Sequence, residues 1–248
     1  MIGVLDSGIG GVTVLREILK QGINAKFIYY SDSKNNPYGD KSEDEVYSIV
    51  KGIVDYLLDK GCIAIVIACN TASAICVKRL RSEYPDTLFI AIEPAYKMVH
   101  DYNPEGKTLV MATEGTIKSE KFLTLFNKYD NHKTILLPCK GLAELIEEGN
   151  EDEINQYLES NLSRYKDIDN VVLGCTHYPL IKDNIRRVLG NVKLFDGSLG
   201  VSKELARQLN LRGITFDNKS YSVVFIDSSG DASKEKRFRE LMGMIIND

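Results

Sequence analysis

The chain has 248 residues, of which 44% are hydrophobic and 27% charged. This composition is typical of a globular protein with one large domain or two of ordinary size. The formal net charge of −4 excludes a general basic surface for nucleic acid or anionic lipid. The longest apolar run, residues 62–69, is far too short to cross a bilayer, and the N-terminus shows no signal-peptide pattern. Five cysteines without a Cys-x-x-Cys spacing favour reduced thiols and a cytoplasmic location.

Short apolar runs alternate with longer amphipathic stretches, which predicts β–α units on a parallel sheet. The expected strands are 2–5, 26–30, 64–68, 88–92, 108–111, 134–137, 171–174, 193–195 and 223–226. The expected helices are 11–21, 44–60, 72–83, 119–129, 142–148, 154–165, 179–189, 202–208 and 233–246. In 44–60 the apolar residues recur at i, i+3, i+4 and i+7, as in a helix with one buried face.

A weak internal repeat runs through the chain. An early strand leads into LDSGIGG and a later one into ATEGTIKS, while VIACNTASA and VVLGCTHYP share a plan of apolar strand, small residue, cysteine and polar helix start. The repeat predicts one α/β half built twice, with a junction near Pro94, since proline disfavours helix in the residue before it. We therefore expect two similar α/β domains, each with a mainly parallel sheet flanked by helices, related by a pseudo-twofold axis with the active site at their interface.

Polar clusters follow the strands, where open α/β sheets bind ligands. The first, from Asp6 to Gly11, offers glycines and free N–H groups that could hold an anion, but it lacks both dinucleotide and Walker A spacing. A tight turn capped by Asp6 explains it equally well. The NPYGDKS segment around Tyr38 is explained as a Pro/Gly turn bearing a phenol.

Cys69 and Cys175 each stand at a strand exit and a helix entry. A helix start can favour the thiolate, and His177 is the only histidine close to a cysteine. The alternatives are buried structural thiols, a zinc site that lacks an evident fourth ligand, and a Cys–His hydrolase that leaves one cysteine idle. The remaining cysteines are interpreted as structural: Cys62, Cys76 and Cys139.

Two thiols on opposite walls of one cleft suggest proton transfer on both faces of a single carbon. One thiolate removes a proton, and the other thiol delivers one, so the stereocentre inverts without cofactor or metal. Contact of both sulfurs with the carbon would place Cys69 and Cys175 sulfur atoms about 7 Å apart, not disulfide-linked.

The motifs LDSGIGGVTVLREI, NPYGDKS, ACNTASA, IEPA, ATEGTIKS and LGCTHYPLI resemble, in order and spacing, those of bacterial glutamate racemases of the aspartate/glutamate/hydantoin racemase superfamily. The resemblance implies cofactor-independent interconversion of L- and D-glutamate, supplying D-glutamate for peptidoglycan. It also implies two α/β halves with the C-terminal segment returning to the first, here residues 1–94 with 200–248 and residues 95–199. A homodimer acting on a small molecule is expected, without nucleic acid or membrane.

By the same resemblance, Cys69 acts on D-glutamate with help from Asp6, and Cys175 acts on L-glutamate with help from His177. The substrate contacts implied are Asp6, Ser7, Tyr38, Gly39, Asn70, Thr71, Thr113, Thr116, Thr176 and His177. Asp32 and Glu147 match positions that are acidic and near the site in some members.

Three departures from the family pattern are visible: Asn35-Asn36 before the proline, Lys140-Gly141 after Cys139, and a loose match at 195–198. They are expected to affect oligomer contacts and regulation more than chemistry. Two other functions stay open: a racemase for aspartate or another acidic amino acid, and a regulatory protein, such as a topoisomerase inhibitor, that has kept the fold.

Overall fold

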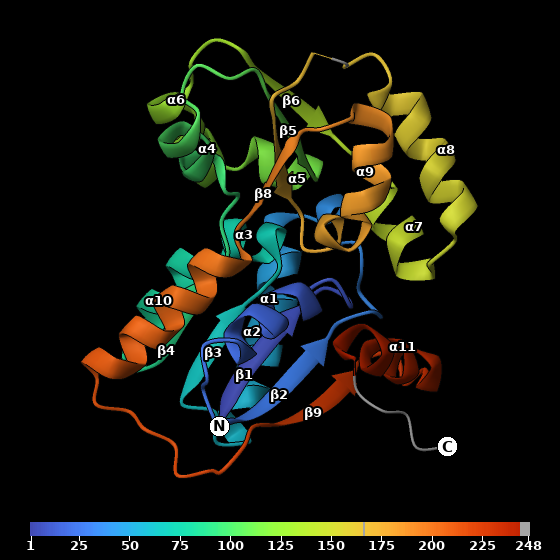
Figure 1. Ribbon diagram of the computed structural model, residues 1–248. Coiled ribbons are helices and arrows are strands. Elements are labelled where there is room, and N and C mark those ends of the chain that lie inside the picture. Colours follow the sequence, from blue (N-terminus) through green and yellow to red (C-terminus); the bar gives the residue numbers. More distant parts are fainter. Residues whose placement is uncertain (166, 244–248) are drawn as a thin grey trace. The chain divides into compact units, whose positions relative to one another are not determined.

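The computed structural model describes residues 1–165 and 167–243. Its contacts divide the chain into two compact units, the first formed by Met1–Ile92 with the chain from Ser198 onward, and the second by Glu93–Gly197. Each unit is an α/β layer structure with a parallel sheet flanked by helices, as predicted (Figure 1). No helix within the described ranges has the length and apolarity that a membrane crossing requires.

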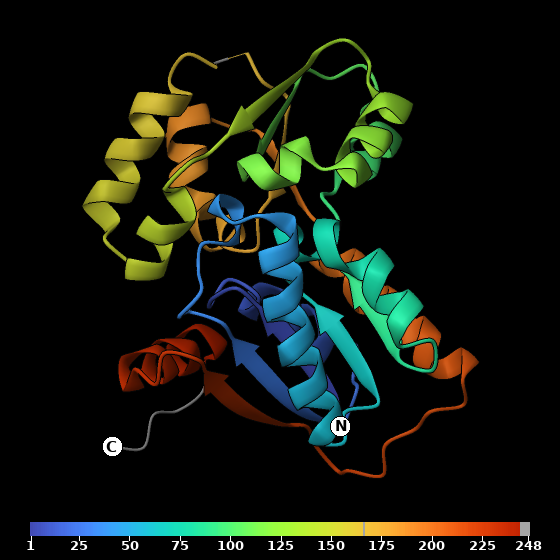
Figure 2. The same ribbon diagram turned by 180° about the vertical axis from the view of Figure 1, so that it is seen from behind.

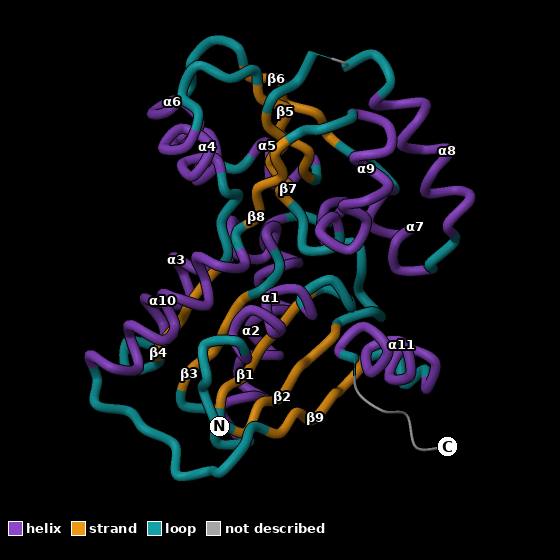
Figure 3. The backbone as a smooth tube through the Cα atoms, in the orientation of Figure 1, coloured by secondary structure: helices purple, strands orange, loops and turns teal. Residues whose placement is uncertain are grey.

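The first unit contains a five-stranded sheet in the order β4-β3-β1-β2-β9. Its elements are β1 (Ile2–Asp6), α1 (Val12–Leu19), β2 (Lys26–Ser31), a 3-10 helix (Tyr38–Asp40), α2 (Glu43–Asp59), β3 (Ala64–Ile67), α3 (Asn70–Glu83), β4 (Leu88–Ala91), α10 (Ser198–Leu211), β9 (Ser222–Asp227) and α11 (Ala232–Met242). Helix α1 packs with α10 and α11 on one face of the sheet, and α2 with α3 on the other (Figures 1 and 2). The chain returns after α10 through a long loop to place β9 beside β2 (Figure 3).

The second unit contains a four-stranded sheet in the order β6-β5-β7-β8. Its elements are α4 (Tyr96–Tyr102), β5 (Thr108–Ala112), α5 (Glu114–Lys118), α6 (Glu120–Tyr129), β6 (Thr134–Pro138), α7 (Leu142–Glu148), α8 (Glu151–Leu162), β7 (Asn170–Gly174), a 3-10 helix (Tyr178–Ile181), α9 (Lys182–Leu189) and β8 (Lys193–Asp196). Alternate residues of the strands face opposite layers. Leu109 and Met111 pack toward α7, α8 and α9, whereas Val110 and Ala112 pack toward α4 and α6.

The two sheets share one strand order, which matches the internal repeat of the sequence. Read from one edge, the first sheet begins β4-β3-β1-β2 and the second runs β8-β7-β5-β6, so each of these first four strands has a counterpart four strands later. The first unit adds β9 at its edge beyond β2. Within the described residues, all neighbouring strands of both sheets pair in parallel.

The helix bounds differ from the sequence expectations where side chains cap the helix. Helix α8 begins at Glu151 rather than 154 because the Asn150 side chain accepts a hydrogen bond from the Glu153 N–H. Helix α10 begins at Ser198, and Ser202, expected to start it, donates instead to the Leu199 carbonyl inside the helix. The helix expected over 233–246 ends at Met242, and its last residues, 244–246, lie outside the described part of the chain.

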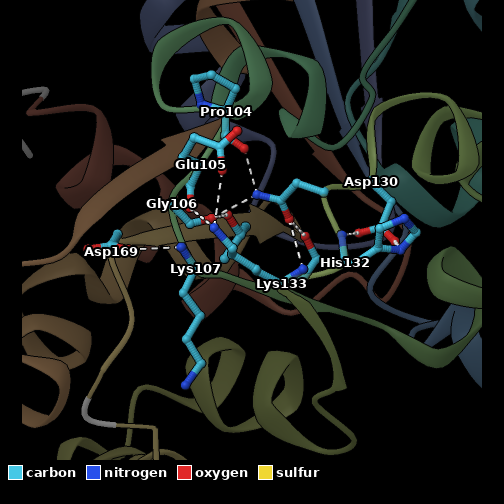
Figure 4. Close-up of polar contacts among 11 residues, drawn as sticks. Pro104, Glu105, Gly106, Lys107, Asp130, His132, Lys133 and Asp169 are labelled. Atoms are coloured by element: carbon cyan, nitrogen blue, oxygen red, sulfur yellow. Dashed lines mark hydrogen bonds and ion pairs between the residues drawn. The ribbon is translucent and has the colours of Figure 1, made fainter.

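The amino end of the second sheet is closed by a network of turn contacts (Figure 4). The Lys107 N–H donates to Asp169, and Asn131 donates to the carbonyl oxygens of Pro104 and Gly106. His132 has a positive φ of 62° and pairs with Asp130. These contacts satisfy backbone groups between elements, so this end of the sheet is structural.

Candidate active site

Each sheet has one position at which consecutive connections leave in opposite directions. In the first sheet β1 lies between β2 and β3, and in the second β5 lies between β6 and β7. Such switch points open a crevice at the carboxyl ends of the two strands, where α/β proteins bind ligands. Cys69 follows β3 and Cys175 directly follows β7, so both predicted cysteines lie at the switch point of their own sheet.

The Cys69 thiol caps helix α3. Its sulfur accepts a hydrogen bond from the Ala72 N–H at 3.5 Å and lies 3.5 Å from the Ser7 hydroxyl oxygen. Cys69 is only 5% exposed. The first amide groups of a helix carry partial positive charge, which favours negative charge on this sulfur. Helix α3 therefore begins at Asn70, two residues before the predicted start.

Asp6 ends β1 beside this cysteine and is fully buried. Its carboxylate accepts the Gly11 N–H at 2.9 Å and the Gly8 N–H at 3.4 Å, so it does cap the turn as the structural interpretation expects. Gly11 has no room for a side chain, because a methyl group would lie 2.8 Å from both the Asp6 Cβ and the Tyr29 hydroxyl. The turn thus holds a buried carboxylate in a fixed position.

Asp32 and Tyr38 form a second polar pair of the first unit, here called the Asp32–Tyr38 arm. The Tyr38 hydroxyl donates to Asp32 at 2.6 Å, and both side chains are buried. Burial, followed by the nearby Asp32 carboxylate, raises the pKa of Tyr38 far above its ordinary value, so the phenol stays a proton donor. Tyr38 packs in the same buried cluster as Cys69.

Asn35 contacts this arm, which the sequence did not predict. Its amide donates to both carboxylate oxygens of Asp32, at 3.0 and 3.1 Å. Asn35 is one of the positions at which the chain departs from the family pattern. Here it places a neutral amide on the carboxylate that holds Tyr38.

Asn70 has a buried amide without a partner. Its side-chain nitrogen and oxygen make no hydrogen bond with the described residues, and the residue is only 4% exposed. Leaving both groups unpaired is unfavourable unless a ligand satisfies them. Its neighbour Thr71 is buried as well, whereas Gly39 in the 3-10 helix is half-buried.

In the second unit Cys175 heads a row of three side chains. Its sulfur lies 3.6 Å from His177 Nδ1, and His177 Nε2 lies 2.7 Å from a carboxylate oxygen of Glu147. Burial alone would lower the pKa of His177, but its hydrogen bonds to Cys175 and Glu147 and their negative charges outweigh burial and raise it well above the ordinary value. The imidazole is therefore held as a proton donor against the sulfur.

Three threonines complete the candidate residues of this unit. Thr113 follows β5 and caps α5, accepting from the Thr116 N–H at 3.2 Å and donating to the Thr116 hydroxyl at 2.9 Å. Thr116 and Thr176 are buried. Thr113 occupies the position after β5 that Ser7 occupies after β1.

The five cysteines are free and buried. Burial raises the pKa of Cys76 and of Cys139 to about 12, so both are poor nucleophiles, as expected of structural thiols. Burial also raises the pKa of Cys62. No group of three or more His, Cys, Asp or Glu side chains in residues 1–165 and 167–243 is arranged to hold a metal ion.

The predicted site residues fall into two sets, one on each unit. The first unit gathers Asp6, Ser7, Asp32, Tyr38, Gly39, Cys69, Asn70 and Thr71. The second gathers Thr113, Thr116, Glu147, Cys175, Thr176 and His177. We call these sets the Cys69 half-site and the Cys175 half-site.

Comparison with known proteins gives consistent matches along the chain. The model of a family described as Asp/Glu/Hydantoin racemase matches residues 12–199. A glutamate racemase of Clostridium perfringens is 45% identical over 239 residues, covering 94% of this chain and 92% of that protein. The crystal structure of a glutamate racemase isoform from Bacillus anthracis matches with a TM-score of 0.87 and 33% identity, covering 100% of this chain and 95% of that one. A glutamate racemase from Francisella tularensis, solved in complex with D-glutamate, matches with a TM-score of 0.83 and 29% identity, covering 99% and 94%.

Proposed function

The chain belongs to the Asp/Glu/hydantoin racemase family, and we propose that it is a glutamate racemase. The enzyme is an isomerase that interconverts L- and D-glutamate and supplies D-glutamate for peptidoglycan synthesis. The observation that carries the proposal is the repeated strand order, which puts one cysteine at the switch point of each sheet. A fold built twice around two thiols suits a reaction that needs one acid–base group on each face of a carbon.

In the proposed reaction the Cys69 thiolate removes the Cα proton of D-glutamate. The electron pair stays on the substrate as a carbanion delocalised into the α-carboxylate, and the Cys175 thiol donates its proton to the opposite face. L-glutamate leaves with Cys69 as the thiol and Cys175 as the thiolate, and the reverse reaction starts from that state. No electrons are transferred to or from the protein, and no cofactor is proposed.

Each cysteine is assisted by its own neighbours. Asp6 acts on the Cys69 side, and His177 on the Cys175 side, where Glu147 keeps the imidazole protonated and oriented. Cα of an amino acid is a very weak acid, so developing negative charge must be stabilised by fixed donors in a site from which water is excluded. The side chains proposed to hold the substrate are Asp6, Ser7, Tyr38, Gly39, Asn70, Thr71, Thr113, Thr116, Thr176 and His177.

Asn70 supports the substrate-binding part of this proposal most directly. Its buried amide carries two unpaired groups beside Cys69, and a carboxylate and an ammonium group of a bound amino acid would satisfy both. Asp32 contributes through Tyr38, whose hydroxyl it holds.

The test is solvent deuterium incorporation. Purified protein is incubated in D2O with L- and D-glutamate, and with L- and D-aspartate as the comparison substrates, without pyridoxal phosphate or added metal. We expect deuterium at Cα of product glutamate and slower exchange with aspartate. Retention of protium throughout conversion would refute two-base racemisation, and faster turnover of aspartate would identify the other acidic amino acid as substrate.

The resemblance to glutamate racemases also supports a homodimer and a cytoplasmic location. Light scattering coupled to gel filtration tests the first proposal, with twice the mass of one chain as the expected result. Cell fractionation tests the second.

A further inference from the structure

A cluster of hydroxyl groups joins the carboxyl ends of β2 and β9. Ser31 pairs with Asp227 in the strand register, the Ser228 N–H donates to the Ser31 carbonyl at 2.9 Å, and the Lys34 N–H donates to the Ser228 hydroxyl at 3.0 Å. The Ser33 hydroxyl donates to the Asp227 carboxylate at 2.5 Å. Strand β9 comes from the C-terminal part of the chain, so these bonds fasten residues 31–34 to a segment almost two hundred residues away.

The Asp227 carboxylate fixes the direction of the hydrogen bonds in this cluster. A hydroxyl has a single proton, and Ser33 gives it to Asp227. The 3.0 Å contact between the Ser31 and Ser33 hydroxyls then has Ser31 as the donor. A hydroxyl bond to a carboxylate is among the stronger hydrogen bonds in proteins, so Asp227 orders both serines.

Asp32 lies between these two serines. Its own N–H donates to the Asp6 carbonyl at 2.9 Å, while its carboxylate, 1% exposed, holds Tyr38. Residues 31–33 are thus hydrogen-bonded to the end of β1 through Asp6 and to the end of β9 through Asp227. Ser33 directly follows Asp32 in the chain, so its bond to Asp227 helps to set where the Asp32 carboxylate presents its oxygen to the Tyr38 hydroxyl.

We propose that Asp227 is a positioning residue for catalysis, which holds the Asp32–Tyr38 arm in place within the Cys69 half-site through Ser33. The proposal rests on the proposed racemase function. It explains what β9 adds to the first unit, since the second sheet has no counterpart of this strand among residues 93–165 and 167–197. It also predicts that loss of the Asp227 carboxylate slows proton transfer by Cys69 and not by Cys175.

The experiment compares Cα-deuterated D- and L-glutamate as substrates of the wild type and of Asp227→Ala. In the variant, kcat/KM should fall about tenfold, since small displacements of catalytic groups slow a reaction strongly. The primary isotope effect on kcat/KM should rise with D-glutamate, because proton removal by Cys69 limits the rate more fully. It should fall with L-glutamate, where removal by Cys175 limits the rate less.

Two further variants separate positioning from folding. Ser33→Ala leaves the C-terminal segment intact and should reproduce the opposite shifts of the two isotope effects. Asp227→Asn keeps one acceptor oxygen, but Ser33 bonds to one carboxylate oxygen of Asp227 and the Ser229 N–H and hydroxyl bond to the other. This variant should therefore restore only part of the wild-type values. The control is Asp231→Ala, which removes the cap of α11 on the same segment, where Asp231 accepts from the Ser233 N–H. It should lower the Tm and leave both isotope effects unchanged.

Three results would overturn the inference. Folded Asp227→Ala and Ser33→Ala with wild-type isotope effects would reduce the cluster to a structural role, as would the same shifts in Asp231→Ala. A wild-type chain that does not exchange the Cα proton of glutamate removes the proposed function and this inference with it. If the wild type racemises glutamate but Asp227→Ala and Ser33→Ala keep the wild-type isotope effects, the proposed function stands and only this inference fails.

Discussion

The two half-sites occupy the same place in two sheets of the same strand order, but their cysteines have different neighbours. Cys69 has the Ser7 hydroxyl and the start of α3 beside it, with a buried carboxylate, Asp6, in the adjacent turn. Cys175 has an imidazole backed by Glu147. The repeated fold thus determines where the two thiols lie, while the residues around each thiol determine how its proton is managed. All three histidines of the chain belong to the second unit.

The largest expected effect comes from removing either thiol. Cys69→Ser and Cys175→Ser should each lower racemisation by at least about 10³-fold, because a hydroxyl is a far weaker acid than a thiol and neither base can replace the other. Circular dichroism of the glutamate solution measures the rate.

The same two variants assign the faces of the substrate. Each should retain elimination from an amino acid with a leaving group at Cβ, Cys175→Ser with the D-enantiomer and Cys69→Ser with the L-enantiomer, since elimination needs one base only. Equal processing of one enantiomer by both variants would show that the proposed assignment of faces is wrong.

The neighbours of the thiols should matter less than the thiols. His177→Asn and Asp6→Asn are each expected to lower kcat/KM by about 10²-fold, the usual contribution of a positioned acid or base. Deuterium isotope effects in the two directions make the comparison sharper. They should shift in opposite senses in the two variants, because each variant slows a different proton transfer. Identical shifts would mean that both residues act on the same step.

The parallel strands and the two cysteines could be predicted from the sequence because they depend on local pattern. The strand ends lie within one residue of the expected positions, and the cysteines follow β3 and β7 as expected. The contacts of Asn35 with Asp32 and of Asp227 with Ser33 could not be predicted, since they join loops whose geometry no periodicity describes. The sequence predicts Cys69 at a helix entry but a helix start at residue 72, two residues late, because cysteine is not among the usual N-cap residues.

A closely packed glycine lies near each half-site in the chain, Gly11 in the turn after Asp6 and Gly174 directly before Cys175, and this allows a stability comparison. A methyl group at Gly174 would lie 2.7 Å from the Ala112 Cβ and 3.0 Å from the Met111 carbonyl oxygen, and Gly11 is equally crowded. Gly11→Ala and Gly174→Ala should each lower the free energy of unfolding by about 1–3 kcal/mol in urea denaturation.

Gly200, in the first turn of α10, is the control for these two substitutions. Nothing lies within 4 Å of a methyl group there, so Gly200→Ala should stabilise the protein by about 0.5–1 kcal/mol through the helix alone. Tolerance of one crowded glycine but not the other would mean that the two strand ends are held with different rigidity.

The smallest effect concerns the pH dependence of stability and is specific to the Cys175 half-site. The pKa of His177 is raised in the folded state, where burial opposes protonation but the bonds to Cys175 and Glu147 prevail. Between the unfolded pKa of about 6.5 and the higher folded one, only the folded protein holds this proton. Its stabilisation is complete below about pH 6.5 and is lost as the pH rises through the folded value, with a slope of at most about 1.4 kcal/mol per pH unit.

His177→Asn should abolish this slope in denaturation curves from pH 6 to 8.5, and Glu147→Gln should move its upper end to lower pH, because the carboxylate that favours the imidazolium is gone. An unchanged slope in both variants would mean that the pair does not hold its proton in the folded state, and the difference between the half-sites would then rest on geometry alone.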